Sequence, residues 1–180
     1  MNLETAHYIN ILFGTGIIVL QVLALLALLL LVGRVKESRY LSFIKNHFIE
    51  IGFLISGAIF LVSAFYSEVL NYIPCKHCWI QRIFILPQVF LFAVAWWRKD
   101  RNVLWYSLLL LAVGFLDAVY LAYIYYFSSS TVPCDASGVS CVLQLVREFG
   151  GYISIPSLSL SGFAILLVLL AVAHFYKKGE

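Results

Sequence analysis

Charged residues are scarce in this chain of 180 residues. Only 12% of its residues are charged and 63% are hydrophobic, whereas soluble domains have about 25% charged and roughly 45–50% apolar residues. The low content of glycine and proline, 11 and 4 residues, excludes collagen-like, low-complexity and disordered classes. Four cysteines are too few for a secreted disulfide scaffold. The composition therefore predicts a membrane protein, in which each cysteine needs its own explanation.

The small positive net charge of +3 does not indicate a nucleic-acid partner. The basic residues fall in short clusters between apolar runs rather than on one continuous face, and such clusters report membrane topology. We therefore expect contact with membrane lipid and no binding of nucleic acid.

Five apolar stretches are long enough to cross a bilayer, since a core of about 30 Å needs roughly 20 helical residues. They cover approximately residues 8–33, 51–70, 78–97, 102–126 and 156–176. The first is too long for a signal-peptide core and no Lys or Arg precedes it, so we expect a retained helix. The predicted fold is an all-α membrane protein with a four-helix transmembrane bundle in residues 51–180. Residues 1–50 would hold one additional N-terminal transmembrane helix and a cytoplasmic connection.

Orientation is predicted from the Lys and Arg residues in the connections, which are enriched on the cytoplasmic side. Nine lie at one end, namely Arg34, Lys36, Arg39, Lys45, Arg98, Lys99, Arg101, Lys177 and Lys178, and three at the other, namely Lys76, Arg82 and Arg147. This asymmetry predicts a multi-pass protein with the N-terminus outside and the C-terminus in the cytoplasm. All four cysteines would then face the outside, where disulfides persist.

The first cysteine pair opens the third span. Cys75 and Cys78 follow Pro74 and enclose two residues, so both sulfurs are expected near a helix N-terminus, whose amides stabilise a thiolate and lower its pKa. No histidine follows Cys78, which excludes c-type haem attachment. The pattern predicts a redox-active pair. Lys76 and His77 are expected to be solvated neighbours that tune the local charge.

The second cysteine pair, Cys134 and Cys141, lies in the longest outer connection. A fixed pair and a mobile pair on one side of the membrane suit the relay of a disulfide by thiolate attack. Two alternatives stay open: the loop pair is a static staple, or Cys75, His77, Cys78 and a loop cysteine bind zinc. We expect no metal.

Apolar residues at positions 142, 145, 146 and 149 predict a short surface helix after Cys141.

Arg82 is expected one turn below Cys78 and on the same helical face. It lies 15 residues from Trp97, about 22 Å at 1.5 Å per residue, and an arginine inside the membrane is usually functional or paired. It could bind a carbonyl oxygen of a lipid-soluble electron acceptor, or simply snorkel to the headgroups. Asp117, at a similar depth, is a candidate partner of Arg82 that either relays a proton to the acceptor or only neutralises the arginine.

These motifs together resemble the DsbB/BdbC family of bacterial disulfide-bond-formation membrane proteins. The resemblance rests on the Cys-Lys-His-Cys-Trp-Ile-Gln-Arg stretch 75–82, on Cys134 and Cys141, and on the Phe-Gly-Gly-Tyr-Ile-Ser-Ile-Pro stretch 149–156. The additional first helix departs from the usual four-helix pattern of the family. Vitamin K epoxide reductase-like proteins are a related alternative, but they place the loop pair before the Cys-x-x-Cys.

The resemblance implies electron transfer from a DsbA-like thioredoxin-fold thiol oxidase to a quinone, either ubiquinone or menaquinone, in the bacterial plasma membrane. By position, Cys134 would form the mixed disulfide with the partner and Cys141 would exchange with Cys75. Cys78 would then face the quinone beside Arg82. The expected function is a quinone-dependent thiol oxidoreductase that supports disulfide formation in exported proteins. The rival functions are a metal-binding or metal-transporting membrane protein and a structural multi-span protein.

Overall fold

Six α-helices and one short 3₁₀ helix make up the computed structural model, which describes residues 3–35, 37–127, 146 and 149–177. The elements are α1 (Leu3–Val32), α2 (Arg39–Asn46), α3 (Phe48–Glu68), α4 (Lys76–Arg98), α5 (Val103–Phe127), η1 (Phe149–Gly151) and α6 (Ile155–Phe175). All of the α-helices except α2 are long and apolar enough to cross a membrane. The prediction of an all-α membrane protein is confirmed, and the ends of the last four spans differ from the predicted ones by at most three residues.

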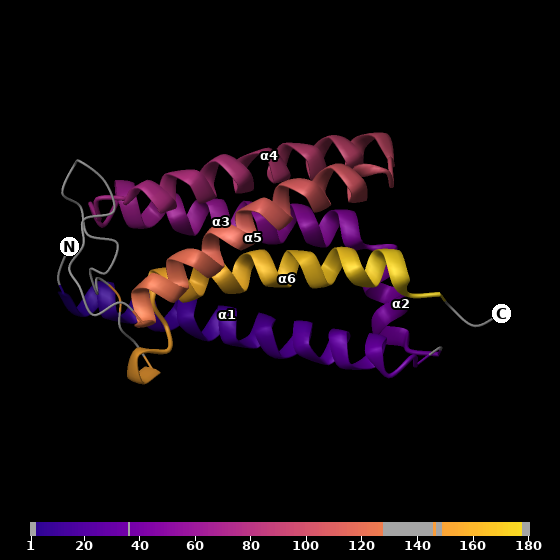
Figure 1. The fold of residues 1–180 in the computed structure, drawn as a ribbon, viewed down its shortest axis with the longest axis horizontal. Coiled ribbons are helices and arrows are strands. Elements are labelled where there is room, and N and C mark those ends of the chain that lie inside the picture. Colours follow the sequence, from indigo (N-terminus) through magenta and orange to yellow (C-terminus); the bar gives the residue numbers. More distant parts are fainter. Residues whose placement is uncertain (1–2, 36, 128–145, 147–148, 178–180) are drawn as a thin grey trace.

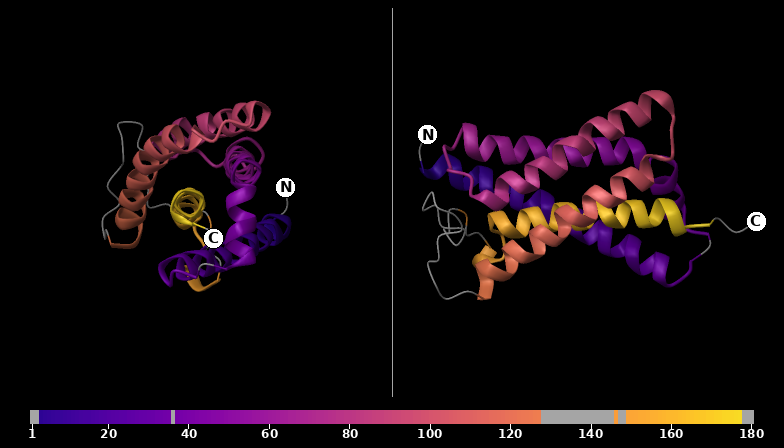
Figure 2. Two further views of the ribbon diagram at one scale, coloured as in Figure 1. Left: turned by 90° about the vertical axis from the view of Figure 1, so that its right-hand side faces the viewer. Right: turned by 45° about the horizontal axis from the view of Figure 1, so that its top comes forward.

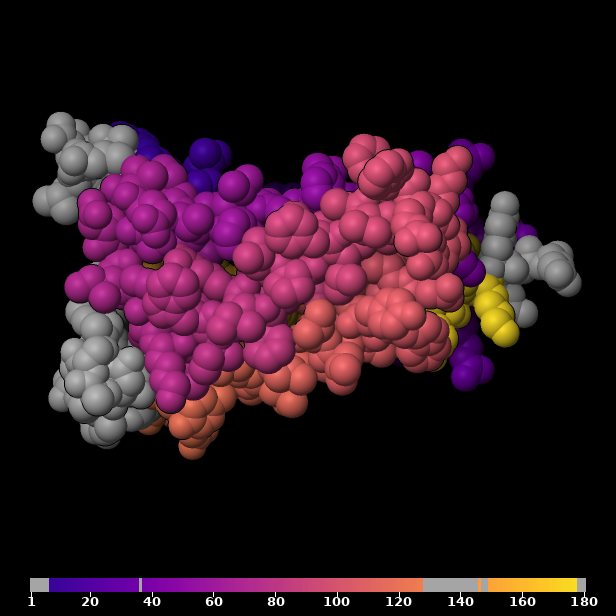
Figure 3. Space-filling model, turned by 90° about the horizontal axis from the view of Figure 1, so that it is seen from above, coloured from indigo at the N-terminus to yellow at the C-terminus, as the bar shows by residue number. Residues whose placement is uncertain are grey.

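The long helices run up and down, so that the two chain termini lie at opposite ends of the bundle (Figure 1). Viewed along the bundle, α6 lies in the middle, α3, α4 and α5 form an arc around it, and α1 lies on the other side (Figure 2). Figure 3 shows the long side of the bundle formed by α3, α4 and α5, which cover most of α6. Half of the α6 span is buried but only 6% of the α1 span, so α6 is the centre of the bundle.

Two glycines let neighbouring helices approach closely. A Cβ atom on Gly52 of α3 would lie 2.7 Å from the ring of Phe92 on α4, and a Cβ on Gly114 of α5 would collide with the ring of Phe163 on α6. Both rings are almost fully buried. Because a side chain larger than hydrogen at Gly52 or Gly114 would overlap these rings, the two glycines allow the close spacing of the helix pairs α3–α4 and α5–α6.

The additional helix α1 packs on the bundle of its own chain. Near its N-terminus, Asn10 Oδ1 accepts a hydrogen bond of 2.9 Å from Tyr66 Oη of α3. In the middle of the helix, Gln21 Nε2 donates to Ser161 Oγ of α6 at 2.5 Å, and Gln21 Oε1 accepts from Tyr152 Oη at 3.0 Å. In an otherwise apolar helix, polar side chains favour the face that packs against other helices, where they find hydrogen-bond partners.

At the opposite end, the short helix α2 joins the other elements, a feature that the sequence prediction missed. Ser38 caps its N-terminus, and Leu41 and Ile44 are buried. Lys45 Nζ donates a 2.5 Å hydrogen bond to the carbonyl oxygen of Tyr176 after α6, and Arg101 Nη2 donates to the carbonyl of Lys45. The sequence analysis predicted this segment only as a connection, because eight residues are too few to span a membrane.

The predicted surface helix in the outer loop falls mostly outside the described residues. Of its four apolar positions only Val146 and Phe149 are described: Val146 is 2% exposed, and Phe149 begins η1.

Close packing at Gly52 predicts a sharp difference between two glycines of the same helix. The Gly52→Ala substitution should destabilise the bundle by about 1–3 kcal/mol, because its methyl group overlaps the buried ring of Phe92. Gly57→Ala is the matched control, since a Cβ there has nothing within 4 Å. Thermal unfolding of the purified protein in detergent measures both, and equal stabilities of the two variants would contradict this packing.

Candidate functional site

The turn between α3 and α4 positions the first cysteine pair. Asn71 adopts a positive φ of 54°, a conformation that asparagine tolerates better than most residues. The ring of Tyr72 stacks on that of Tyr66 with centroids 5.9 Å apart, and the Tyr72 amide donates to the carbonyl of Tyr66. Pro74 follows, and Cys75 then takes the N-cap position of α4.

Cys75 and Cys78 lie one helical turn apart and face each other. Their sulfur atoms are 3.2 Å apart, and both residues are free thiols in this structure. Cys75 is 8% exposed and packs with Leu121 of α5, against which Cys78 also lies. The pair is therefore close enough to form a disulfide without a large backbone movement, and Leu121 shields it from one side.

The environment favours the thiolate form of Cys75. The Cys78 thiol donates a hydrogen bond to the Cys75 sulfur, and this is the largest effect lowering the pKa of Cys75 to about 6, although burial opposes it. The main-chain amides of His77 and Cys78 act in the same direction without completing an N-cap hydrogen bond. Of the two sulfurs, Cys75 is therefore the one that more readily forms a thiolate, which is the reactive form of a cysteine.

Arg82 lies one turn below Cys78, as predicted, and its charge is held by two serines of α3. Its Nε donates to Ser63 Oγ at 2.9 Å, and its Nη2 donates to the Ser63 carbonyl at 2.5 Å and to Ser67 Oγ at 2.7 Å. The guanidinium also lies 5.2 Å from the centre of the Trp79 ring, within cation–π range. Its Nη1 has no hydrogen-bond partner among the described residues, which leaves two N–H groups for a bound molecule.

The predicted pairing of Arg82 with Asp117 is wrong. Asp117 Oδ1 bonds to His77 Nδ1 at 2.7 Å, and both side chains are about 15% exposed, 14% for Asp117 and 15% for His77. Equal depth in the membrane fixes the height of two residues but not the side of the helix on which they lie, and Arg82 turns toward α3. His77, predicted to be a solvated neighbour, therefore links the start of α4 to α5.

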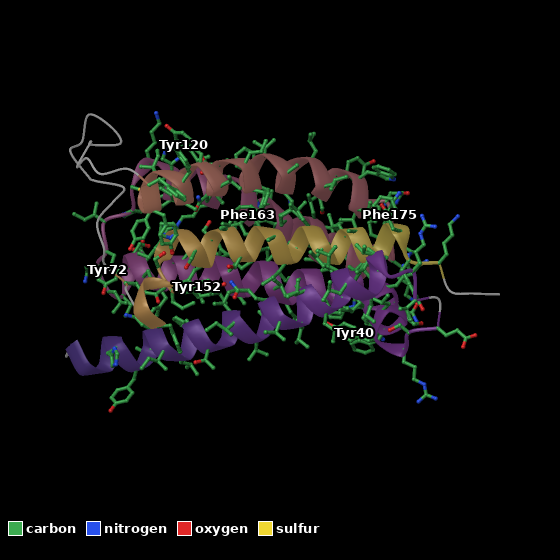
Figure 4. All side chains as sticks on the ribbon, turned by 60° about the horizontal axis from the view of Figure 1, so that its bottom comes forward. Tyr40, Tyr72, Tyr120, Tyr152, Phe163 and Phe175 are labelled. Atoms are coloured by element: carbon green, nitrogen blue, oxygen red, sulfur yellow. The ribbon has the colours of Figure 1, made fainter. Side chains whose placement is uncertain are left out.

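A mostly apolar cavity of about 400 Å³ opens beside the cysteine pair. Cys75, Cys78 and Arg82 line it at one end, and Phe163 lines it deeper in the bundle. Figure 4 shows Tyr72, another lining residue, at one end of the bundle and Phe163 near the middle. From Cys78 to Ile85, which also lines it, α4 rises about 10 Å. The cavity is thus large enough for the ring and part of the tail of an apolar ligand.

The additional helix α1 forms part of the cavity wall through Leu12, Phe13, Gly16, Ile17 and Leu20. A Cβ on Gly16 would meet nothing within 4 Å, whereas a Cβ on Gly14 would contact Phe149 and Ile153. The two small residues of α1 therefore differ in role: Gly14 packs against the chain, and Gly16 leaves space. Asp117, predicted as a possible contact of the electron acceptor, is not among the described residues that line this cavity.

The loop cysteines Cys134 and Cys141 lie outside the described residues. Within the described part of the chain, no group of three His, Cys, Asp or Glu side chains could hold a metal ion. For zinc binding, His77 would have to bind the metal through Nε2 or exchange its bond to Asp117 for one to the metal.

Ser63 and Ser67 are the site residues that the sequence analysis missed. They are four residues apart near the outer end of the second span, and so lie on one helical face, at the depth predicted for Arg82. That spacing was the available signal.

The fold and the site together define a class: a multi-span membrane protein with a reactive dithiol at one end of a helical bundle. Comparison with known families gives the finer assignment. The family described as disulfide bond formation protein DsbB matches residues 45–173, which is more than half of the chain. The chain therefore belongs to the DsbB family and is a membrane thiol oxidoreductase of the disulfide-forming class. The matched segment contains α3, α4, α5 and all but the last two residues of α6, and it leaves out α1.

Curated relatives agree with the family. Over 138 residues the chain is 33% identical to the probable disulfide formation protein C 2 of Bacillus anthracis. The aligned segment covers 77% of this chain and 98% of that relative. It is 30% identical over 139 residues to the disulfide bond formation protein C of Bacillus subtilis (strain 168), covering 74% and 94% of the two chains. No solved structure matches. The resemblance identified from the cysteine motifs is confirmed.

The hydrogen bond from Cys78 predicts the pH dependence of Cys75 alkylation. In the reduced protein with Cys134→Ser and Cys141→Ser, iodoacetamide labelling of Cys75 should rise with a midpoint near pH 6. Cys78→Ala removes the donor and should raise the midpoint toward that of an ordinary cysteine, about 8.5. Cys78→Ser keeps a hydroxyl donor and should hold the midpoint low. Mass spectrometry of the labelled peptide measures all three.

A midpoint in Cys78→Ala equal to that of the unsubstituted pair would show that Cys78 does not stabilise the thiolate.

The lowered pKa of Cys75 also makes the free energy of unfolding of the reduced protein depend on pH. Because the folded-state pKa of Cys75, about 6, lies below the value of about 8.5 for a cysteine in an unfolded chain, the reduced protein should gain stability as the pH rises between these two values. It should lose that stability as the pH falls through 6.

Proposed function

We propose that the protein reoxidises an extracytoplasmic thioredoxin-fold thiol oxidase and passes the electrons to a membrane quinone. The observation that carries this proposal is the opening of the Cys75–Cys78 pair into an apolar cavity that also contains the Arg82 guanidinium. A soluble acceptor would need no apolar cavity within the bundle, whereas a quinone is a lipid-soluble molecule with a polar ring. The redox domain is proposed to be residues 51–180, with residues 1–50 as an additional segment.

The proposed path moves two electrons in three exchanges. The partner dithiol reduces the Cys134–Cys141 disulfide and becomes a disulfide itself, with Cys134 forming the mixed disulfide. Cys141 then attacks the Cys75–Cys78 disulfide at Cys75, which regenerates the loop disulfide and leaves a reduced pair. Finally the reduced pair transfers two electrons and its two thiol protons to the quinone, which gives a Cys75–Cys78 disulfide and a quinol.

Arg82 is proposed to hold one carbonyl oxygen of the quinone through its Nη1 group. A fixed guanidinium beside that oxygen stabilises the negative charge that develops there as electrons arrive. Ser63 and Ser67 act as positioning residues, because their hydrogen bonds to Nε and Nη2 keep the guanidinium in the cavity instead of at the headgroups.

His77 and Asp117 are proposed to position the start of α4 rather than to touch the quinone. The bond between His77 Nδ1 and Asp117 Oδ1 ties α4 to α5, and the ring of Tyr120 lies 5.3 Å from that of His77. The pair therefore holds the cysteine-bearing turn from the side opposite to the Arg82–Ser63 contact.

Localisation is proposed to be the bacterial plasma membrane, with the N-terminus and the cysteines outside and the C-terminus in the cytoplasm. The support is the asymmetry of basic residues, together with the requirement that a loop pair meet an exported partner where disulfides persist.

The proposed order of exchange predicts which cysteine substitution traps the partner. Cys141→Ser leaves Cys134 as the single loop thiol, which can attack the disulfide of the oxidised partner, so that one partner sulfur joins Cys134 and the other leaves as a thiolate. Because no second loop sulfur can attack this mixed disulfide, a covalent adduct of the partner with Cys134 should accumulate on non-reducing gels. Cys134→Ser should form no such adduct. Cys75→Ser should stop steady-state oxidation of the partner in the presence of quinone. The adduct is measured with purified protein and the oxidised thioredoxin-fold partner, and the turnover is measured with the reduced partner and a soluble quinone analogue.

Full turnover by both Cys134→Ser and Cys141→Ser would show that the loop pair is a static staple. Zinc bound at one equivalent by the reduced protein, with no transfer of electrons to quinone, would favour the metal-binding rival instead.

Arg82 substitution predicts a selective defect in the quinone step. Arg82→Met removes a charge-assisted hydrogen bond worth roughly 1.5–3 kcal/mol, so KM for quinone should rise about ten- to a hundredfold. The rate of stoichiometric partner oxidation without quinone should stay unchanged, because that step uses the cysteines alone. Arg98→Met, at the opposite end of α4, is the matched control. An unchanged KM for quinone in Arg82→Met would show that Arg82 does not bind the quinone and only reaches toward the lipid headgroups.

A further inference from the structure

Gln81 is a buried polar residue of the cavity wall whose hydrogen bonding is incomplete. Its side chain is 7% exposed and lines the cavity beside Arg82. Its Oε1 accepts a hydrogen bond of 2.6 Å from Ser159 Oγ of α6, but its Nε2 has no partner among the described residues. Buried amide groups are nearly always hydrogen-bonded in folded proteins, so this donor indicates a missing acceptor.

In the structure, the contact with Ser159 is made by Oε1 and leaves the amino group of Gln81 without a partner among the described residues. Ser159 also lines the cavity, and its hydroxyl holds Oε1, the only acceptor of the side chain. The amino group is therefore the end that remains without a partner. Gln81 follows Cys78 by three residues and precedes Arg82, so one turn of α4 carries a thiol, an amide donor and a guanidinium.

The chemistry of these groups points to a ligand with two acceptor oxygens on an apolar body. The cavity wall is otherwise mostly apolar, and both Gln81 Nε2 and Arg82 Nη1 can only donate. We propose that Gln81 Nε2 donates a hydrogen bond to one carbonyl oxygen of a quinone while Arg82 Nη1 binds the other. This inference rests on the proposed function and adds to it a specificity-determining residue: an acceptor with a single carbonyl would leave one buried donor without a partner.

The test compares two glutamines of the same helix. Gln81→Met keeps the size and flexibility of the side chain but removes the donor, and Gln88→Met is the matched control. Gln88 is also buried, its Nε2 donates to the Ser107 carbonyl at 3.4 Å, and it is not among the described residues that line the cavity. Three quantities are measured on the full chain: KM for quinone, the Kd for quinone from quenching of tryptophan fluorescence, and partner oxidation without quinone.

The proposal predicts that Gln81→Met raises both KM and Kd for quinone roughly three- to tenfold, the loss expected for one neutral hydrogen bond. Partner oxidation without quinone should not change, and Gln88→Met should match the unsubstituted protein. If Gln81→Met fails to fold, Gln81→Leu removes the donor with a side chain of a different shape, and the same rise is expected. Unchanged KM and Kd in the folded Gln81 variant, or an equal rise in Gln88→Met, would overturn the role of Gln81 alone. An unsubstituted protein that neither binds nor reduces quinone would overturn the proposed function as well.

Discussion

The first turns of α4 impose the constraint on which the rest of the structure depends. They hold a reactive dithiol at the end of the bundle and place a guanidinium one turn deeper in the apolar layer, where an unpaired charge is costly. Ser63 and Ser67 offset this cost through three hydrogen bonds to Arg82. These bonds require α3 and α4 to lie close together, and the contact of Gly52 with Phe92 provides that closeness lower in the bundle.

The same turns are held from a second side by α5, through His77 and Asp117 and through Leu121 against the cysteines. With α3 and α5 fixed, the space beside Cys78 is bounded by α6 and by α1, which supplies five of the residues that line the cavity. The additional helix α1 is therefore part of the wall of the site. Its position follows from Asn10 and Gln21, whose hydrogen bonds to Tyr66, Ser161 and Tyr152 fix the face that it presents.

Much of this arrangement could be predicted from the sequence, because the bilayer sets the length of each span and the two-residue spacing of the first cysteine pair sets its geometry. The height of Arg82 was predictable from residue counts, but its partner was not. Helix rotation depends on packing contacts such as Gly114 against Phe163, which no count of residues reveals, and so Asp117 was assigned to the wrong neighbour. The unsatisfied donor of Gln81 likewise becomes visible only when Ser159 of a distant helix is brought beside it.

The most direct test of the central claim is an electron count under anaerobic conditions. Quinone-free purified protein is mixed with a reduced thioredoxin-fold partner and a measured amount of quinone, and both the loss of partner thiols and the formation of quinol are quantified. The account predicts one quinol for every two partner thiols lost, and no quinol with the Cys75→Ser variant. Partner oxidation beyond the protein's own disulfides without quinol formation, or quinol formed by Cys75→Ser, would contradict it.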